Sequence, residues 1–134
     1  MGFIRVIHQS YYDPDRGRFT SLAFRHSSDG SGISTFEEEC SLRVSGSICE
    51  HIAGFYHAIS STPAIFWIIE PQLLPDTCHY QSQPISDGDP CHYGILGLTH
   101  KEEKAIFGQA RLSDFRICVG NGEHRALDKS DLEP

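Results

Sequence analysis

The sequence has no apolar run long enough to cross a bilayer, because its longest uninterrupted run is Ala64 to Ile69. Positive charge is also scarce: 11 Lys and Arg stand against 18 Asp and Glu, so the net charge is −7. This balance repels a phosphate backbone and disfavours nucleic acid as a partner. Arg16, Arg18 and Arg25 form a local basic patch, which fits a solvated loop equally well. We therefore expect no membrane contact and disfavour a nucleic-acid target.

The N-terminal stretch MGFIRVIHQ lacks the basic region, the long apolar region and the cleavage site of a secretory signal. Val6 also stands where an N-myristoylation signal needs Ser or Thr. Five cysteines, an odd number without a framework spacing, occur in a chain large enough to fold without disulfides. The sequence therefore predicts cytoplasmic residence and reduced thiols.

A length of 134 residues and an apolar content of 39% are typical of one globular domain. We expect this domain to span residues 1–120, followed by a polar acidic tail over 121–134 that is disordered. Strand patterns occur at 3–8, 19–24, 92–98 and 113–119. The segment 64–69 lacks polar alternation, which predicts a strand at the centre of the sheet with Phe66 and Ile68 inaccessible to solvent.

Helix signals begin at Ser34, because Ser34-x-x-Glu37 and Thr35-x-x-Glu38 both match a capping box. Apolar residues then recur at helical spacing, at Cys40, Val44, Ile48, Ile52, Tyr56 and Ile59. The Ser-Gly-Ser interruption at 45–47 kinks or splits this region. A second capping box at Thr99 begins a short helix that ends near Phe107, and the proline-rich segment 70–90 is a long surface loop. The fold class is thus a single α+β domain with a mixed or antiparallel sheet of about five strands, packed on the helical region Glu37 to Ser60.

Two segments hold a polar residue at the mouth of a strand: DGSGISTF at 29–36 carries Ser34, and DPCHYGILGL at 89–98 carries His92. With Arg5 and His8 on the first strand, these residues offer donors to a phosphate or a ribose. Gly32 lets a ligand approach the backbone closely, although a plain loop has the same composition. Arg5 and His8 point to opposite faces unless the strand bulges or ends at Ile7. A purely structural interpretation, in which Arg5 pairs with an acidic residue and His92 satisfies a turn, fits the sequence about as well.

Three other chemistries fit less well. The tripeptide Cys-His-Tyr occurs at 78–80 and 91–93, but adjacent Cys and His side chains diverge in extended chain, so zinc is not expected. A nucleophilic Cys40, Cys49 or Cys91 lacks a suitably placed histidine base. His8-Gln9-Ser10 and His26-Ser27-Ser28 match the His-x-Ser form of two-histidine phosphoesterases, but they are only 18 residues apart.

An early Arg followed by TSLAF, DGSGIST and DPCHYGILGL resembles a group of small bacterial proteins with the pattern S-x-AF, DG-x-x-x-S and H-x-x-I-x-G. The resemblance covers about Arg5 to Leu98 and implies a bacterial cytosolic domain. An architectural resemblance to the ADP-ribosyltransferase-like superfamily implies NAD as the cofactor, with Arg5 or His8 on the first strand, Ser34 before a helix and His92 in the third place. Glu usually stands in that third place, and Glu70 is the only acidic alternative in a comparable setting.

Two functions therefore remain open. The first is an NAD-handling ADP-ribosyltransferase-like enzyme, as a toxin or defence effector, in which Arg5 or His8 holds the cofactor, Ser34 orients the ribose and His92 lies near the scissile bond. The second is a non-catalytic module that docks on a protein partner through its acidic surface and the proline-rich loop 70–90.

Overall fold

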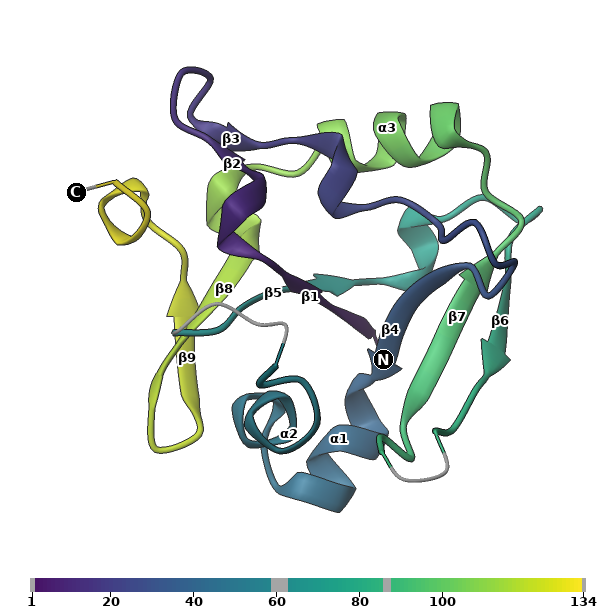
Figure 1. Ribbon diagram of the computed structural model, residues 1–134, viewed down its shortest axis with the longest axis horizontal. Helices are drawn as coiled ribbons and strands as arrows, with labels where there is room; N and C mark the ends of the chain where they lie inside the picture. The colour runs from purple at the N-terminus through teal and green to yellow at the C-terminus, as the bar shows by residue number, and fades with distance from the viewer. Residues whose placement is uncertain (1, 59–62, 86–87, 134) are drawn as a thin grey trace.

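A seven-stranded sheet in the order β6-β7-β4-β1-β5-β8-β9 forms the middle layer of the protein (Figure 1). The computed structural model describes residues 2–58, 63–85 and 88–133. The strands are β1 (Phe3–Ile7), β4 (Ile33–Glu37), β5 (Ile65–Ile69), β6 (His79–Ser82), β7 (His92–Leu96), β8 (Phe115–Gly120) and β9 (Glu123–Ala126). Every neighbouring pair is antiparallel, so the predicted α+β fold is confirmed.

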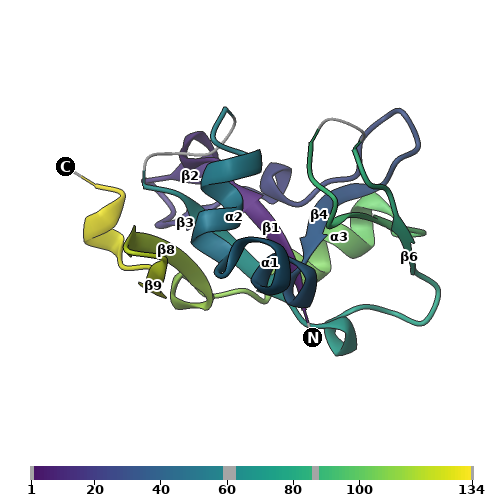
Figure 2. The same cartoon turned by 90° about the horizontal axis from the view of Figure 1, so that it is seen from below.

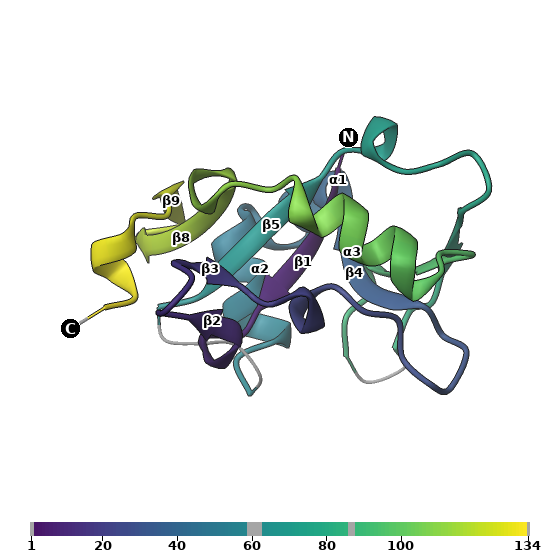
Figure 3. The ribbon, with the colours of Figure 1, turned by 90° about the horizontal axis from the view of Figure 1, so that it is seen from above.

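The helices cover both faces of this sheet. Helices α1 (Glu38–Ser45) and α2 (Ile48–Phe55) lie on one face (Figure 2), whereas α3 (His100–Gly108) lies on the other (Figure 3). A small hairpin of β2 (Tyr12–Asp13) and β3 (Arg18–Phe19) and a short 3-10 helix (Ser21–Ala23) also lie on the α3 side. The two-residue alternation of β1 sends Ile4 toward α2 and sends Phe3 and Ile7 toward α3.

The two faces have cores of different size. Under α3, stacked and edge-on rings of Phe24, Trp67, Phe107 and Phe115 build the larger core. The core under α2 is smaller and includes Phe36 and Phe66. A core that removes more apolar area from water contributes more to stability. The smaller core under α2 therefore depends more on other interactions to hold that face together.

The predicted helix start is wrong, because Ser34 and Thr35 lie in β4 and helix α1 begins at Glu38. Pairing of β4 with β7 and β1 outweighs the local capping signals. The expected split is confirmed at Gly46, whose φ of 85° ends α1 and favours glycine. Val44, expected in the apolar stripe, is 49% exposed. Ile59 and Ser60 lie outside the described residues.

The strand predicted at 64–69 forms as β5, but β1 and not β5 is the central strand. Phe66 is fully buried as expected, whereas Ile68 is only partly buried. The sheet also has two strands that the sequence did not predict, one at each end. Strand β6 lies within the expected surface loop 70–90, and β9 lies where a disordered tail was expected. Leu127, directly after β9, is buried in the larger core.

Two disulfides contradict the expectation of reduced thiols. Cys40 of α1 is bonded to Cys91, which precedes β7, and Cys49 of α2 is bonded to Cys118 of β8. Both links lie on the face with the smaller core, and they close separations of 51 and 69 residues. Cross-links of this span limit the freedom of the unfolded chain, so they add stability where apolar burial is smaller. Cys78 is the free cysteine in the described part of the chain.

We expect the double variant Cys49→Ala/Cys118→Ala to lower the free energy of unfolding by about 2–4 kcal/mol, because the unfolded chain regains its freedom. Urea denaturation under non-reducing conditions measures this loss. Cys78→Ala, which breaks no disulfide, serves as the control. Equal urea midpoints for the wild type with and without a reductant would contradict the expectation.

Candidate functional site

Strands β1 and β4 separate in the middle of the sheet. They pair only at Phe3 with Glu37 and at Ile4 with Phe36, after which β1 continues beside β5 and β4 continues beside β7 (Figure 1). The gap carries a small cavity of about 30 Å³, whose walls include Arg5, Ser34 and Tyr56. Unpaired strand backbone here leaves carbonyl groups that need other donors.

Arg5 supplies one of those donors. Its Nη1 donates to the backbone oxygen of Ser34 at 2.8 Å, and its Nε donates to the oxygen of Ala23 at 3.0 Å. Burial lowers the pKa of the guanidinium, and the nearby Tyr11 and Glu103 partly offset this effect. An arginine keeps its charge at neutral pH even so. The sequence-based alternative of a direct ion pair with an acidic residue is therefore replaced by two carbonyl contacts.

Ser34 and His92 form a hydrogen-bonded pair. The Oγ of Ser34 lies 2.6 Å from Nε2 of His92, and Nδ1 of His92 lies 3.1 Å from the backbone oxygen of Gln83. A carbonyl only accepts, so Nδ1 carries the proton of the neutral ring and Nε2 accepts from the Ser34 hydroxyl. A hydroxyl, a base and a group that orients the base are the parts of an activated nucleophile or a general base.

His8 follows the end of β1 at Ile7, so the condition under which Arg5 and His8 can line one cleft is met. The two residues line a cavity of about 340 Å³ together with Val6, Ser10 and Tyr11. Nδ1 of His8 contacts the backbone N–H and the hydroxyl of Ser10, at 3.0 and 2.7 Å. The exposed imidazole therefore stands at the mouth of the cavity with one nitrogen engaged.

Two predicted residues lie elsewhere. Gly32, with a φ of +82°, packs against β7 so tightly that a Cβ would lie 2.3 Å from the oxygen of Ile95. It lines a separate cavity of about 210 Å³ with His26, so its glycine serves backbone packing. Glu70 follows Ile69, which pairs with Phe3, and thus lies at the opposite end of β1 from His8. No carboxylate from that position reaches the gap.

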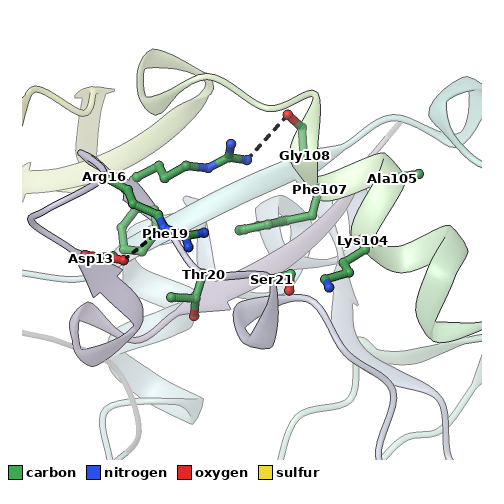
Figure 4. A pocket seen from close by; sticks show the side chains of 10 residues that line it. Asp13, Arg16, Phe19, Thr20, Ser21, Lys104, Ala105, Phe107 and Gly108 are labelled. Carbon is green, nitrogen blue, oxygen red and sulfur yellow. Dashed lines mark hydrogen bonds and ion pairs between the residues drawn. The ribbon is translucent and has the colours of Figure 1, made fainter.

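A cavity of about 600 Å³ lies between the β2–β3 hairpin and α3 (Figure 4). Three cations line it: Arg16 and Arg18 from the hairpin and Lys104 from α3. Phe19 and Phe107 add apolar walls, and Arg16 is paired at 3.7 Å with Asp13. Arg16 and Arg18 thus line a cavity, and both remain exposed, as the solvated loop considered from the sequence also expects.

A second polar cluster joins two segments that are distant in the sequence. Glu103, only 2% exposed, contacts Nδ1 of His26 with one carboxylate oxygen at 2.6 Å and Nδ1 of His100 with the other at 2.8 Å. The two rings stack with centroids 4.1 Å apart. Sequence reasoning missed this cluster, although His100 and Glu103 stand three residues apart on a helix and therefore share a face.

A third cluster is enclosed between α1, α2 and the segment before β7. Asp89 accepts from Nε2 of His51 at 2.7 Å, from the Tyr56 hydroxyl and from the Cys91 backbone N–H at 2.8 Å. Ser45 completes a Ser-His-Asp series through Nδ1 of His51 at 2.8 Å. Because His51 and Asp89 are 0% and 1% exposed, we interpret this series as structural.

The disulfides exclude the nucleophile and the zinc-ligand roles that the sequence suggested for these cysteines. Cys40, Cys49 and Cys91 are in disulfides, so they offer neither a thiolate nucleophile nor a thiolate zinc ligand. The remaining thiol, Cys78, has a pKa raised by burial, which disfavours the reactive thiolate.

Low pH should reduce the stability that the buried Asp89 cluster contributes. Burial alone would raise the pKa of Asp89, but hydrogen bonds from His51, Tyr56 and the Cys91 N–H outweigh it, and the pKa falls below its ordinary 3.8. A carboxyl with a lowered folded-state pKa stabilises the protein above its unfolded-state pKa, and this contribution is lost as the pH falls through the folded-state value. We expect the free energy of unfolding to drop below about pH 4.

Asp89→Asn should lower stability at pH 6 by about 1–3 kcal/mol and flatten this acid dependence, because the amide accepts fewer of the buried donors. Urea denaturation at pH 6 and pH 3 compares it with the exposed Asp76→Asn. The same loss in both variants would exclude a specific role for Asp89.

Comparisons with protein-family models, with curated proteins and with solved structures find no match to this chain. Both resemblances drawn from the sequence therefore stay predictions. The functional argument depends on the geometry of the gap, the cavities and the polar clusters.

Proposed function

We propose that this protein is an NAD-handling, ADP-ribosyltransferase-like enzyme, of toxin or defence type, that binds the dinucleotide at the gap between β1 and β4. The observation that carries the proposal is the 2.6 Å contact between Ser34 and His92, in a strand whose backbone oxygen at Ser34 is bound by the Arg5 guanidinium. Arg5 and Ser34 line the cavity at this gap, His92 is hydrogen-bonded to Ser34, and His8 lines a second cavity with Arg5.

Arg5 and His8 hold the phosphates in this proposal. Arg5 uses two of its five N–H groups on carbonyls, which leaves donors for an anion. The cavity that it shares with His8 has about the volume of a small ligand pocket, so it takes one half of the dinucleotide. The cationic cavity of Arg16, Arg18 and Lys104 is adjacent, because Thr20 in its wall donates at 2.8 Å to the carbonyl of Tyr11. The second half extends toward those cations.

Ser34 and His92 supply the chemistry. Ser34 orients a ribose hydroxyl, and Nε2 of His92 accepts a proton. In the proposed step the bond between ribose C1′ and nicotinamide breaks, a hydroxyl nucleophile bonds to C1′, and its proton passes to His92. This assignment needs no glutamate in the third place, which accords with the remote position of Glu70.

The proposal also concerns the cellular compartment in which the protein acts. Disulfides form and persist in oxidising surroundings, so Cys40–Cys91 and Cys49–Cys118 count against the cytoplasmic residence expected from the N-terminal sequence. In the described part of the chain, no helix is both long and apolar enough to span a bilayer. A secreted or surface-acting effector fits the disulfides better.

The test is a thermal shift with millimolar NAD, followed by an assay of NAD consumption. A ligand at 100 times its Kd stabilises the folded state by about 2.7 kcal/mol, so the wild type should melt at a higher temperature. His8→Ala should reduce this shift. His92→Ala should abolish consumption of NAD, and a thermal melt without ligand checks that this variant is still folded.

His79→Ala is the matched control, because His79 is an exposed histidine on β6. Arg5→Ala is unsuitable, since it also removes two hydrogen bonds to backbone. The absence of any shift in the wild type, or an equal shift in all variants without turnover, would refute the proposal.

Binding of a protein partner is the second candidate function, favoured by the exposed edge of the sheet. All four residues of β6 are exposed, Tyr80 of this strand is 38% exposed, and Ile85, which follows the strand, is 52% exposed. An exposed edge strand can pair with a strand of another chain.

If the edge binds a partner, Tyr80→Ser/Ile85→Ser should abolish its co-purification. Val119→Ser, at an apolar residue that is 51% exposed on β8, should not. Quantitative mass spectrometry of proteins retained by each immobilised variant measures this difference. Identical sets of retained proteins for the double variant and the control would exclude the edge.

A further inference from the structure

The cluster of His26, His100 and Glu103 is distinct from the proposed nucleotide gap in its residues and its chemistry. One ring nitrogen from each histidine and one oxygen of Glu103 lie within 4.8 Å of one another. Imidazole and carboxylate are the donors that zinc and similar divalent transition metals take. Tetrahedral zinc, with bonds of about 2.0–2.1 Å, holds its ligand atoms about 3.3 Å apart. Because the two imidazoles are parallel, at an interplanar angle of 2°, metal binding requires that one ring rotate until both nitrogen lone pairs point at the same ion.

The surroundings keep the donors together. Glu103 is buried and receives a third hydrogen bond, from the backbone N–H of His26 at 2.9 Å, so its carboxylate is fixed toward the histidines. His100 and Glu103 share the first turn of α3, and His26 precedes the loop that leads to β4. The parallel stack of the two imidazoles, with an interplanar angle of 2°, places both rings at the same carboxylate.

We propose that His26, His100 and Glu103 bind one divalent transition metal ion, of which zinc is the best match. Two histidines and one glutamate form a three-ligand set, and such sets are typical of catalytic zinc, whose fourth position holds water or substrate. The side chains of His26 and His100 are 34% and 53% exposed, so the fourth position opens to solvent. The cavity of about 210 Å³ beside His26, lined also by Ser27, Gly30 and Leu98, gives room for a small ligand of the metal.

Metal binding replaces the contacts of both Nδ1 atoms with Glu103, because each nitrogen must offer its lone pair to the ion. The site uses neither Ser34 nor His92, so the metal proposal can be tested separately from the NAD proposal. It also differs from the zinc arrangement disfavoured in the sequence, which used Cys-His pairs.

The experiment is calorimetric titration of the full chain with zinc sulfate, after removal of metals by a chelator and without reductant, so that the disulfides stay intact. We expect one zinc ion per chain. Removal of one ligand should cost at least the roughly 10- to 100-fold in affinity that loss of an outer-shell partner costs. His26→Ala and His100→Ala are the principal variants, since both side chains are partly exposed and their loss leaves the core intact.

Cobalt(II) provides a second readout, because d–d absorption reports coordination geometry without any enzymatic assay. The wild type and the control His57→Ala, at an exposed histidine after α2, should give the same tetrahedral spectrum, and both ligand variants should lose it. Cys78→Ser should bind normally, which excludes the free thiol as the ligand. No stoichiometric zinc binding by the wild type, wild-type affinity in His26→Ala or in His100→Ala, or loss of binding in Cys78→Ser would each overturn the proposal.

Discussion

The side chain of Arg5 determines how the sheet can open in its middle and remain one sheet. Where β1 and β4 stop pairing, a carbonyl of β4 would lack its ladder partner, and the guanidinium replaces that partner by donating to the oxygen of Ser34. The same side chain holds the 3-10 helix on the α3 face through the oxygen of Ala23. One cation therefore stabilises the gap, its neighbour Ser34 and the segment that leads to His26.

The two faces of the sheet are stabilised by different means. Under α3, aromatic rings pack into one large core, and dispersion and apolar burial suffice. Under α2, two disulfides and the Asp89 cluster add covalent and polar links to fewer apolar contacts. The Ser34 and His92 pair lies next to this second face, so a rigid support lies beneath the hydroxyl and its base.

Local patterns predicted the α+β class, the buried β5, the break at Gly46 and the cap of α3, because each depends on residues close in the sequence. They failed where the structure depends on contacts between segments that are distant in the sequence. Strand β4 overrides a helix signal, β6 and β9 form only through pairing with neighbours, and no spacing rule indicates that Cys40 meets Cys91. For the site, turn residues before strands pointed to Ser34 and His92, which meet across 58 residues, while their functional role stays a prediction. The His26 contact with Glu103 spans 77 residues, so only tertiary structure reveals it.

Gly32 and Gly94 determine where the loop after His26 can lie. A Cβ at Gly94 would lie 2.2 Å from the oxygen of Ser31, just as one at Gly32 would strike the backbone of β7. Loop and strand thus touch backbone to backbone, at a separation that no other residue type permits. Two glycines spaced 62 positions apart are therefore a sequence signature of this loop, and distant relatives of this chain should keep both glycines even where their reactive side chains differ.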